Sequence, residues 1–175
     1  MTQPDIVTWS DAVFETLMTY KIRQVVYVPD AGHLHLINRC LQSDHVIAVP
    51  LTTEEEGIAL LAGAWLGGER GVLLMQSSGV GNCLNMLSLT RVCQMPLLML
   101  VTMRGEPGEY NPWQVPMGEN TEALLTTGGV RVFPVSRSDQ LEQTVETAAA
   151  MVFGGEAAAA VLISQRMLGV KSFEQ

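Results

Sequence analysis

Charged side chains are scarce in this sequence. Asp, Glu, Lys and Arg make up 16% of the 175 residues, whereas an ordinary soluble domain holds about 25%. The 18 acidic residues outnumber the 10 basic ones, which gives a formal net charge of −8. That balance argues against binding to nucleic acid or to an anionic membrane, because both need a cationic field. So few charges predict a surface partly buried against another chain, so we expect an oligomer. A monomer rich in Ala, Leu and Met is the alternative.

Cysteines and long apolar runs are also few. The three cysteines, Cys40, Cys83 and Cys93, form no C-x-x-C pair, which argues against a disulfide framework and favours a reducing compartment. Residues 1–10 have neither the basic segment nor the apolar core of a signal peptide. The longest apolar run, 95–103, has the length of a strand and is too short to cross a bilayer. We therefore expect a cytoplasmic protein without a membrane span.

Short apolar runs alternate with longer amphipathic ones. Most of the short runs are continuously apolar, as in strands buried on both faces of a parallel sheet. Their alternation with helices predicts one α/β domain over residues 1–175, a three-layer α/β/α sandwich around a mainly parallel sheet of about six strands. The strands are expected at 24–28, 45–49, 72–75, 96–101, 130–133 and 159–163. Helices are expected at 11–20, where Ser10 can be the cap, and near 32–42, 54–67, 80–94, 119–127 and 138–153.

In such a sheet, ligands bind at the carboxyl ends of the strands. The loops of interest are therefore 29–33, 50–57, 76–82 and 102–120. The third contains Gly79-Val80-Gly81, whose glycines allow a tight turn that could hold an anion at a helix start. It lacks the Lys-Ser/Thr of a P-loop and the third glycine of a dinucleotide fingerprint. A plain strand-to-helix turn and a ligand site both remain open here.

Three consecutive glutamates, Glu54 to Glu56, open the third predicted helix. Acidic side chains in a first turn stabilise a helix through its dipole, which is the simpler interpretation. Successive side chains on a helix point about 100° apart, however, so one of the three must face the sheet. Glu55 lies three residues before Ile58 and is the one expected to do so, which makes it a functional candidate. The buried face is predicted to hold Ile58, Leu61, Ala62 and Trp65.

The loop 103–120 and the histidines supply further candidates. Loops of this length are uncommon unless they are functional or disordered. Arg104 follows a buried strand and is expected at the ligand edge, although a solvated arginine is an equal alternative. His33 could donate a proton or simply lie at a helix start. His33 and His35 lie close in sequence, but no Cys or acid is placed to complete a zinc site, so we expect no metal held by this chain.

The combination of motifs is more specific than its parts, and it resembles the pyrimidine-binding (PYR) domain of thiamine diphosphate enzymes. Within that family the chain is most similar to the small alpha subunits of sulfopyruvate and phosphonopyruvate decarboxylases. The resemblance covers about residues 8–168. It rests on Thr53-Glu54-Glu55-Glu56-Gly57, Gly63-Ala64-Trp65 with Gly67-Gly68, MQSSGVGNCLN (75–85), PLLMLVTMRGE (96–106) and QVPMG (114–118).

This resemblance implies roles for individual residues. Glu55 matches the glutamate that shares a proton with the aminopyrimidine N1′ of the cofactor. Beyond the motif matches, we expect Asp30 and His33 to act as proton shuttles, and His33 and Arg104 to contact an anionic group of the substrate. The positions that match the cofactor-binding motifs are Pro29, Glu55, Ser78, Gly79, Val80, Gly81, Asn82 or Asn85, and Gln114.

One departure from the family is informative. Thiamine diphosphate enzymes hold Mg²⁺ and diphosphate with a G-D-G sequence, and this chain has no Gly-Asp pair. The resemblance therefore implies that a beta subunit with the diphosphate-binding (PP) domain completes the site and holds Mg²⁺, and that PYR domains self-associate. The implied activity is decarboxylation of an anionic 2-oxo acid such as 3-sulfopyruvate or 3-phosphonopyruvate. A decarboxylase or carboligase of other specificity, or a non-catalytic PYR-like binding module, are the alternatives.

Overall fold

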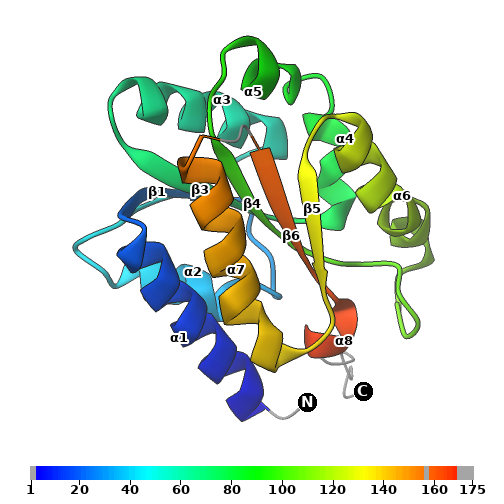
Figure 1. Ribbon diagram of the computed structural model, residues 1–175. Helices are drawn as coiled ribbons and strands as arrows, with labels where there is room; N and C mark the ends of the chain where they lie inside the picture. The colour runs from blue at the N-terminus through cyan, green and yellow to red at the C-terminus, as the bar shows by residue number, and fades with distance from the viewer. Residues whose placement is uncertain (1–2, 156–157, 169–175) are drawn as a thin grey trace.

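Six parallel strands form a single sheet in the order β2-β1-β3-β4-β6-β5 (Figure 1). The structure is a computed structural model that describes residues 3–155 and 158–168. Each predicted strand overlaps an observed one, and the predicted three-layer sandwich is confirmed. The strands are β1 (Ile22–Tyr27), β2 (Ile47–Pro50), β3 (Arg70–Gln76), β4 (Leu97–Thr102), β5 (Arg131–Val135) and β6 (Ala158–Ile163).

Helices cover both faces of the sheet (Figure 1). One face carries α1 (Gln3–Thr19), α2 (Leu34–Leu41) and α7 (Ser138–Phe153). The other carries α3 (Glu54–Leu66), α4 (Val80–Cys83), α5 (Ser88–Val92) and α6 (Val115–Thr127). Short helices at Ser77–Gly79 (η1), Pro112–Gln114 (η2) and Gln165–Leu168 (α8) complete the fold. No helix in the described part of the chain has the length and apolarity needed to cross a bilayer.

The central strands explain why the apolar runs are continuous. All six residues of β4 are buried, and so are all six of β6. Alternate side chains enter opposite cores: Leu98 and Leu100 face the α1–α7 side, while Leu97 and Met99 face the α3–α6 side. The edge strands β2 and β5 are only partly buried, and both contain a proline, which edge positions tolerate.

Several local expectations were wrong. Helix α1 begins at Gln3, so Ser10 lies inside it, buried, and is not its cap. The helix expected over 80–94 is split into α4 and α5. Helix α6 begins at Val115, with Pro116 in its first turn, so the irregular segment after β4 is only 103–111. Trp65 is 39% exposed and does not belong to the buried face of α3.

Candidate active site

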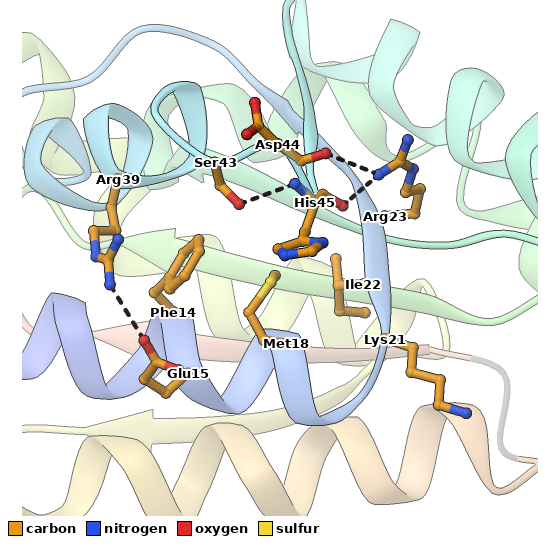
Figure 2. A pocket seen from close by; sticks show the side chains of 10 residues that line it. All are labelled: Phe14, Glu15, Met18, Lys21, Ile22, Arg23, Arg39, Ser43, Asp44 and His45. Carbon is orange, nitrogen blue, oxygen red and sulfur yellow. Dashed lines mark hydrogen bonds and ion pairs between the residues drawn. The ribbon is translucent and has the colours of Figure 1, made fainter.

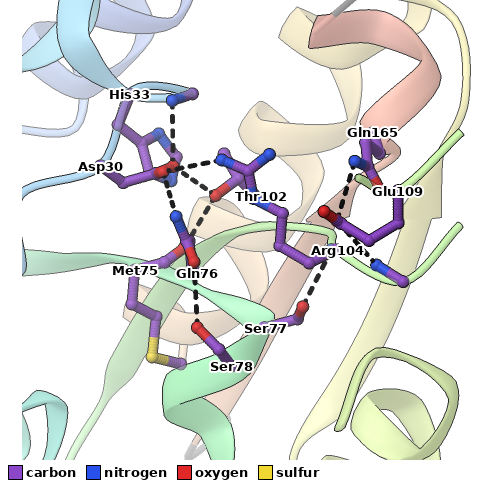
Figure 3. Close-up of polar contacts among 12 residues, drawn as sticks. Asp30, His33, Met75, Gln76, Ser77, Ser78, Thr102, Arg104, Glu109 and Gln165 are labelled. Atoms are coloured by element: carbon purple, nitrogen blue, oxygen red, sulfur yellow. Dashed lines mark hydrogen bonds and ion pairs between the residues drawn. The ribbon is translucent and has the colours of Figure 1, made fainter. Parts of the chain in front are cut away.

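A polar network joins the loops that follow β1, β3 and β4 (Figure 3). At its centre is Asp30, whose side chain is 2% exposed. Its Oδ1 accepts hydrogen bonds from Gln76 Nε2 at 2.5 Å and from Arg104 Nη2 at 3.2 Å. Its Oδ2 accepts from Thr102 Oγ1 at 2.6 Å and from the Gly32 amide at 3.1 Å. The sheet edge therefore brings four donors, from the segments at the ends of β1, β3 and β4, onto one carboxylate.

These donors keep Asp30 ionised. Burial opposes the charge, but the hydrogen bonds from Gln76 and Thr102, and then the neighbouring charges, outweigh it and lower the pKa of Asp30 below its ordinary value. A proton shuttle needs a pKa close to the working pH and a free lone pair. This geometry instead favours Asp30 as an anchor for its neighbours. The shuttle role predicted from the sequence stays a prediction.

Arg104 is at the expected edge but is not free. Its guanidinium pairs with Asp30, and its backbone amide donates to Ser77 Oγ at 2.9 Å. Its side chain is 10% exposed, and Nε is buried with no hydrogen-bond partner in the described residues. The cation predicted to bind substrate is therefore largely neutralised within this chain. The buried Nε is one donor that a ligand could still use.

His33 is fully buried beside this network. Its Nε2 lies 3.1 Å from the carbonyl oxygen of Leu100, which makes Nε2 the donor and leaves Nδ1 as an acceptor. No described residue bonds Nδ1. Burial lowers the pKa of His33, against the opposing effects of Asp30 and of backbone carbonyls. A neutral imidazole cannot attract an anionic group by charge, so its predicted role in substrate binding gains no support here.

The three glutamates that open α3 have three different environments. The carboxylate of Glu56 accepts from the Thr52 amide at 2.9 Å and from the Thr53 amide at 3.4 Å, and so caps the helix. Glu54 is 8% exposed and accepts from Asn82 Nδ2 at 2.9 Å. Glu55 is half-buried, and its Oε2 is buried with no partner in the described part of the chain. Only Glu55 thus keeps an unfilled, buried acceptor.

The sheet-facing glutamate is Glu54, not Glu55 as expected. Glu54 shares the buried face of α3 with Gly57, Ile58 and Leu61, which lie three, four and seven residues further on. It also fills the space beside Gly79: a Cβ on that glycine would lie 2.0 Å from Glu54 Cδ. Sequence reasoning missed this residue. Glu54 lies four and seven residues before Ile58 and Leu61, a spacing that places all three on one face of a helix.

The turn 77–82 packs directly on the start of α3. Burial raises the pKa of Cys83 to about 12, and the nearby carboxylates of Glu54 and Glu55 add to the effect. Gly81 lies against α6, since a Cβ there would be 2.9 Å from Met117 Cε. Asn82 is bonded to Glu54 at the end of this turn, whereas Asn85 lies beyond α4, and both are exposed.

The remaining predicted positions are more scattered. Val80 is buried, and Ser78 Oγ donates to Gln76 Oε1 at 3.0 Å, which links the turn to the Asp30 network. Pro29 is exposed directly before Asp30. Gln114 ends η2 and is half-buried at the start of α6. The structure joins the turn to Glu54, while Pro29 and Gln114 lie on neighbouring loops of the same edge.

Glu109 organises the loop 103–111. Its carboxylate accepts from the Gly105 amide at 3.2 Å, the Asn111 amide at 2.9 Å and Gln165 Nε2 at 2.9 Å. Burial opposes its ionisation, but these bonds lower the pKa of Glu109 overall. Sequence reasoning missed Glu109. It also missed Gln165, Gln76 and Thr102, whose partners lie far away in the sequence and are brought together only by the fold.

A hollow lies at the opposite, amino edge of the sheet (Figure 2). Its volume is about 700 Å³, and Phe14, Met18 and Ile22 are among its lining residues. Its arginines have internal partners: Arg39 Nη2 lies 3.3 Å from Glu15 Oε1, and Arg23 donates to the carbonyl of His45 at 2.8 Å. None of the loops predicted to carry a ligand reaches this hollow.

Comparison with known proteins identifies the family. Residues 7–122 match the family described as thiamine pyrophosphate enzyme, N-terminal TPP binding domain. This chain belongs to that family. Sulfopyruvate decarboxylase subunit alpha of Methanococcus maripaludis is 33% identical over 88% of this chain and 93% of the relative. The subunit of the same name from Methanocaldococcus jannaschii is 30% identical over 81% of this chain and 85% of the relative.

A longer relative matches part of this chain, and a solved structure shares its fold. Phosphonopyruvate decarboxylase of Streptomyces viridochromogenes is 39% identical over 59% of this chain, and the match spans only 27% of that relative. The 2-oxoglutarate:ferredoxin oxidoreductase from Magnetococcus marinus superposes with a TM-score of 0.66 over 93% of this chain and 29% of that chain. Its sequence identity is 14%, so this likeness concerns the fold alone.

The residues present fit part of a thiamine pyrophosphate (thiamine diphosphate) site. The unfilled, buried Oε2 of Glu55 is an acceptor suited to a ring nitrogen that carries or receives a proton. The turn 77–82 beside it offers backbone that a flat ring could approach. Among residues 3–155 and 158–168, no group of three or more His, Cys, Asp or Glu is placed to hold a metal ion.

Proposed function

We propose that this chain is the alpha subunit of a thiamine diphosphate-dependent decarboxylase. Its substrate would be an anionic 2-oxo acid such as 3-sulfopyruvate or 3-phosphonopyruvate, and a second chain would complete the site. The observation that carries the proposal is Glu55, a half-buried glutamate at the start of α3 whose buried Oε2 has no partner in the described residues. The names of the relatives that align with most of this chain support the substrate class.

Each residue has a limited task in this mechanism. Bound thiamine diphosphate would supply the electron sink that lets a 2-oxo acid lose carbon dioxide. Glu55 would hold a proton against the aminopyrimidine ring of the cofactor. Glu54 and Asn82 would fix the turn that borders the ring. The Asp30–Arg104 pair would hold the first and fourth strand loops in place around them.

We infer that the diphosphate and Mg²⁺ are held by the partner chain, a beta subunit with a PP domain. Two observations support this inference. The sequence lacks a Gly-Asp pair, and the related phosphonopyruvate decarboxylase carries a great deal of chain beyond the part aligned here. The Asp30-bound guanidinium of Arg104 leaves the second anionic group of the substrate to be neutralised mainly by that partner.

The test is reconstitution with the chain that co-purifies from the native host. The proposal expects decarboxylation only when both chains, thiamine diphosphate and Mg²⁺ are present, with sulfopyruvate or phosphonopyruvate preferred over pyruvate. If the complex prefers pyruvate, the proposed substrate class is wrong, while the proposed thiamine diphosphate chemistry stands. A reconstituted complex without any cofactor-dependent turnover would overturn the proposal and favour a non-catalytic binding module.

A further inference from the structure

The loop that follows Arg104 is fastened to the segment that follows β6. The Glu106 amide donates to Gln165 Oε1 at 3.2 Å, and Ser164 Oγ donates to Glu106 Oε2 at 2.6 Å. Gln165 Nε2 donates to Glu109 Oε2 at 2.9 Å. We call Glu106, Glu109, Ser164 and Gln165 the clasp. Its two sides lie 56 to 59 residues apart in the sequence, so only the fold brings them together.

Gln165 uses both ends of its side-chain amide in the clasp (Figure 3). The oxygen accepts from a backbone N–H and the nitrogen donates to a carboxylate, so turning the amide around would lose both bonds. The Glu109 oxygen that Gln165 bonds also accepts from the Gly105 amide, at 3.2 Å. Gln165 therefore holds both residues that come directly after Arg104: Glu106 by a bond of its own, and Gly105 through Glu109.

Other contacts fix the backbone of Arg104 from the side of the sheet. Its amide donates to Ser77 Oγ at 2.9 Å, and the preceding amide, that of Met103, donates to the carbonyl of Ile163 at 2.8 Å. Helix α6 closes on the Arg104 carbonyl, since a Cβ on Gly118 would collide with that oxygen. The clasp adds the contacts at the two residues that come next, so the backbone is held on both sides of Arg104.

The position of Arg104 matters because it carries a donor that its own chain leaves unused. Its Nε is buried and has no hydrogen-bond partner in the described residues. Arg104 and the clasp also interact by charge: burial opposes the ionisation of Glu109, but its hydrogen bonds, and then the charge of Arg104, lower the pKa of Glu109. A donor serves a ligand only where its place is fixed, since a displacement of about 1 Å can cost about 10²-fold in rate.

We propose that Gln165 is a positioning residue for Arg104. Through the clasp it fixes Gly105 and Glu106, and so keeps the unpartnered Nε–H of Arg104 in place at the carboxyl edge of the sheet. An anionic group of the substrate would accept from that N–H, a role for which Gln165 itself needs no contact with the substrate. The contact with substrate rests on the proposed function, whereas the hold of the clasp on the loop does not.

The first experiment measures hydrogen exchange at single N–H groups of the full chain by NMR. Gln165→Ala removes both bonds of the amide and should speed exchange of the Gly105 and Glu106 amides by about tenfold or more. The Nε–H of Arg104 should exchange faster as well, because the loop that covers it is released. Gln143→Ala, which shortens an exposed glutamine on α7, is the matched control and should leave these exchange rates unchanged.

A second set of variants tests the bond between the two clasp side chains. Gln165→Glu sets a carboxylate against that of Glu109 and should speed exchange of the Glu106 amide at least as much as Gln165→Ala. Gln165→Glu/Glu109→Gln pairs an amide with a carboxylate again, and should return that amide to within about threefold of its wild-type exchange rate. The Gly105 amide should recover less, because position 109 then offers one acceptor oxygen in place of two.

The third experiment measures kinetics in the reconstituted complex. Gln165→Ala should raise the KM for sulfopyruvate by about 3–10-fold and leave kcat within about twofold of the wild-type value, as expected when a binding contact is weakened and the chemical step is not. Gln165→Glu/Glu109→Gln should recover part of this KM, and Gln143→Ala should not change it.

Three outcomes would count against the inference. If the Gly105 and Glu106 amides exchange equally fast in the wild type and in Gln165→Ala, the clasp does not hold the loop. If exchange is faster but the KM is unchanged, Gln165 only stabilises the loop, and its positioning role is overturned while the proposed function stands. If the wild-type complex shows no cofactor-dependent turnover, the proposed function and the positioning role both fail, and hydrogen exchange still decides whether the clasp holds the loop.

Discussion

Asp30 and Glu55 lie at the same edge of the sheet and have opposite surroundings. Asp30 receives four hydrogen bonds from its own chain, and its pKa is lowered. Glu55 keeps a buried oxygen for which the described residues provide no donor. A buried carboxylate whose hydrogen bonds all come from its own chain stabilises the fold. A buried acceptor without a donor indicates that a ligand supplies one. The sequence predicted a catalytic role for both carboxylates, whereas their surroundings favour a structural role for Asp30 and a ligand contact for Glu55.

The largest expected change in stability comes from removing Asp30. Asp30→Ala leaves the Arg104 guanidinium buried without its carboxylate, which should lower the free energy of unfolding by about 3–5 kcal/mol. Urea denaturation measures this loss. Replacing both partners, as in Asp30→Leu/Arg104→Met, should recover much of it, because no buried charge is then unpaired. A loss below about 1 kcal/mol for the single variant would contradict the anchoring role.

A methyl group at Gly79 tests the contact between the turn and α3. Gly79→Ala would place a Cβ 2.0 Å from Glu54 Cδ and should lower the free energy of unfolding by about 1–3 kcal/mol. The cost should be smaller in a Glu54→Ala background, because the clashing carboxylate is then absent. Gly63→Ala, where a Cβ meets nothing within 4 Å, is the control and should not destabilise. Equal costs of Gly79→Ala in both backgrounds would refute this packing.

His33 should make stability depend on pH. Its pKa in the folded chain lies below the ordinary value of 6.5, so below that pH the unfolded chain binds more protons and the folded state loses stability. From about pH 7.5 to about pH 5.5 the loss should reach up to about 1.4 kcal/mol. His33→Gln should remove this loss, while His45→Gln, at an exposed position, should retain it. If the free energy of unfolding changes with pH equally in the wild type and in His33→Gln, other groups cause the change.

The smallest expected effect concerns the start of α3. Glu56→Ala removes the acceptor of the Thr52 and Thr53 amides and should lower the free energy of unfolding by about 1 kcal/mol, as expected for one cap at an exposed site. Thermal denaturation detects a change of this size. Stability equal to that of the wild type would mean that water replaces the carboxylate at no cost.

The sequence predicted the fold well because apolar runs such as 96–101 and 159–163 become strands buried on both faces. It also predicted that the loops after β1, β3 and β4 meet at one edge, because the carboxyl ends of parallel strands lie together. It misjudged the glutamates because Glu54 and Glu55 differ by one helical step, and only packing against Gly79 decides which one faces the sheet. It did not foresee the pairing of Arg104 with Asp30, because 74 residues separate the two in the chain.

The most direct test of the account compares three conservative variants of the neighbouring glutamates in the reconstituted complex. Glu55→Gln should reduce kcat by about 10²–10⁴-fold without loss of folding, since its unfilled oxygen bonds nothing within the described chain. Glu56→Gln should keep kcat within a few-fold of the wild-type value and affect mainly stability. The loss of kcat in Glu54→Gln should lie between those of the other two variants. Normal turnover by Glu55→Gln, in a complex that binds thiamine diphosphate, would contradict the central assignment.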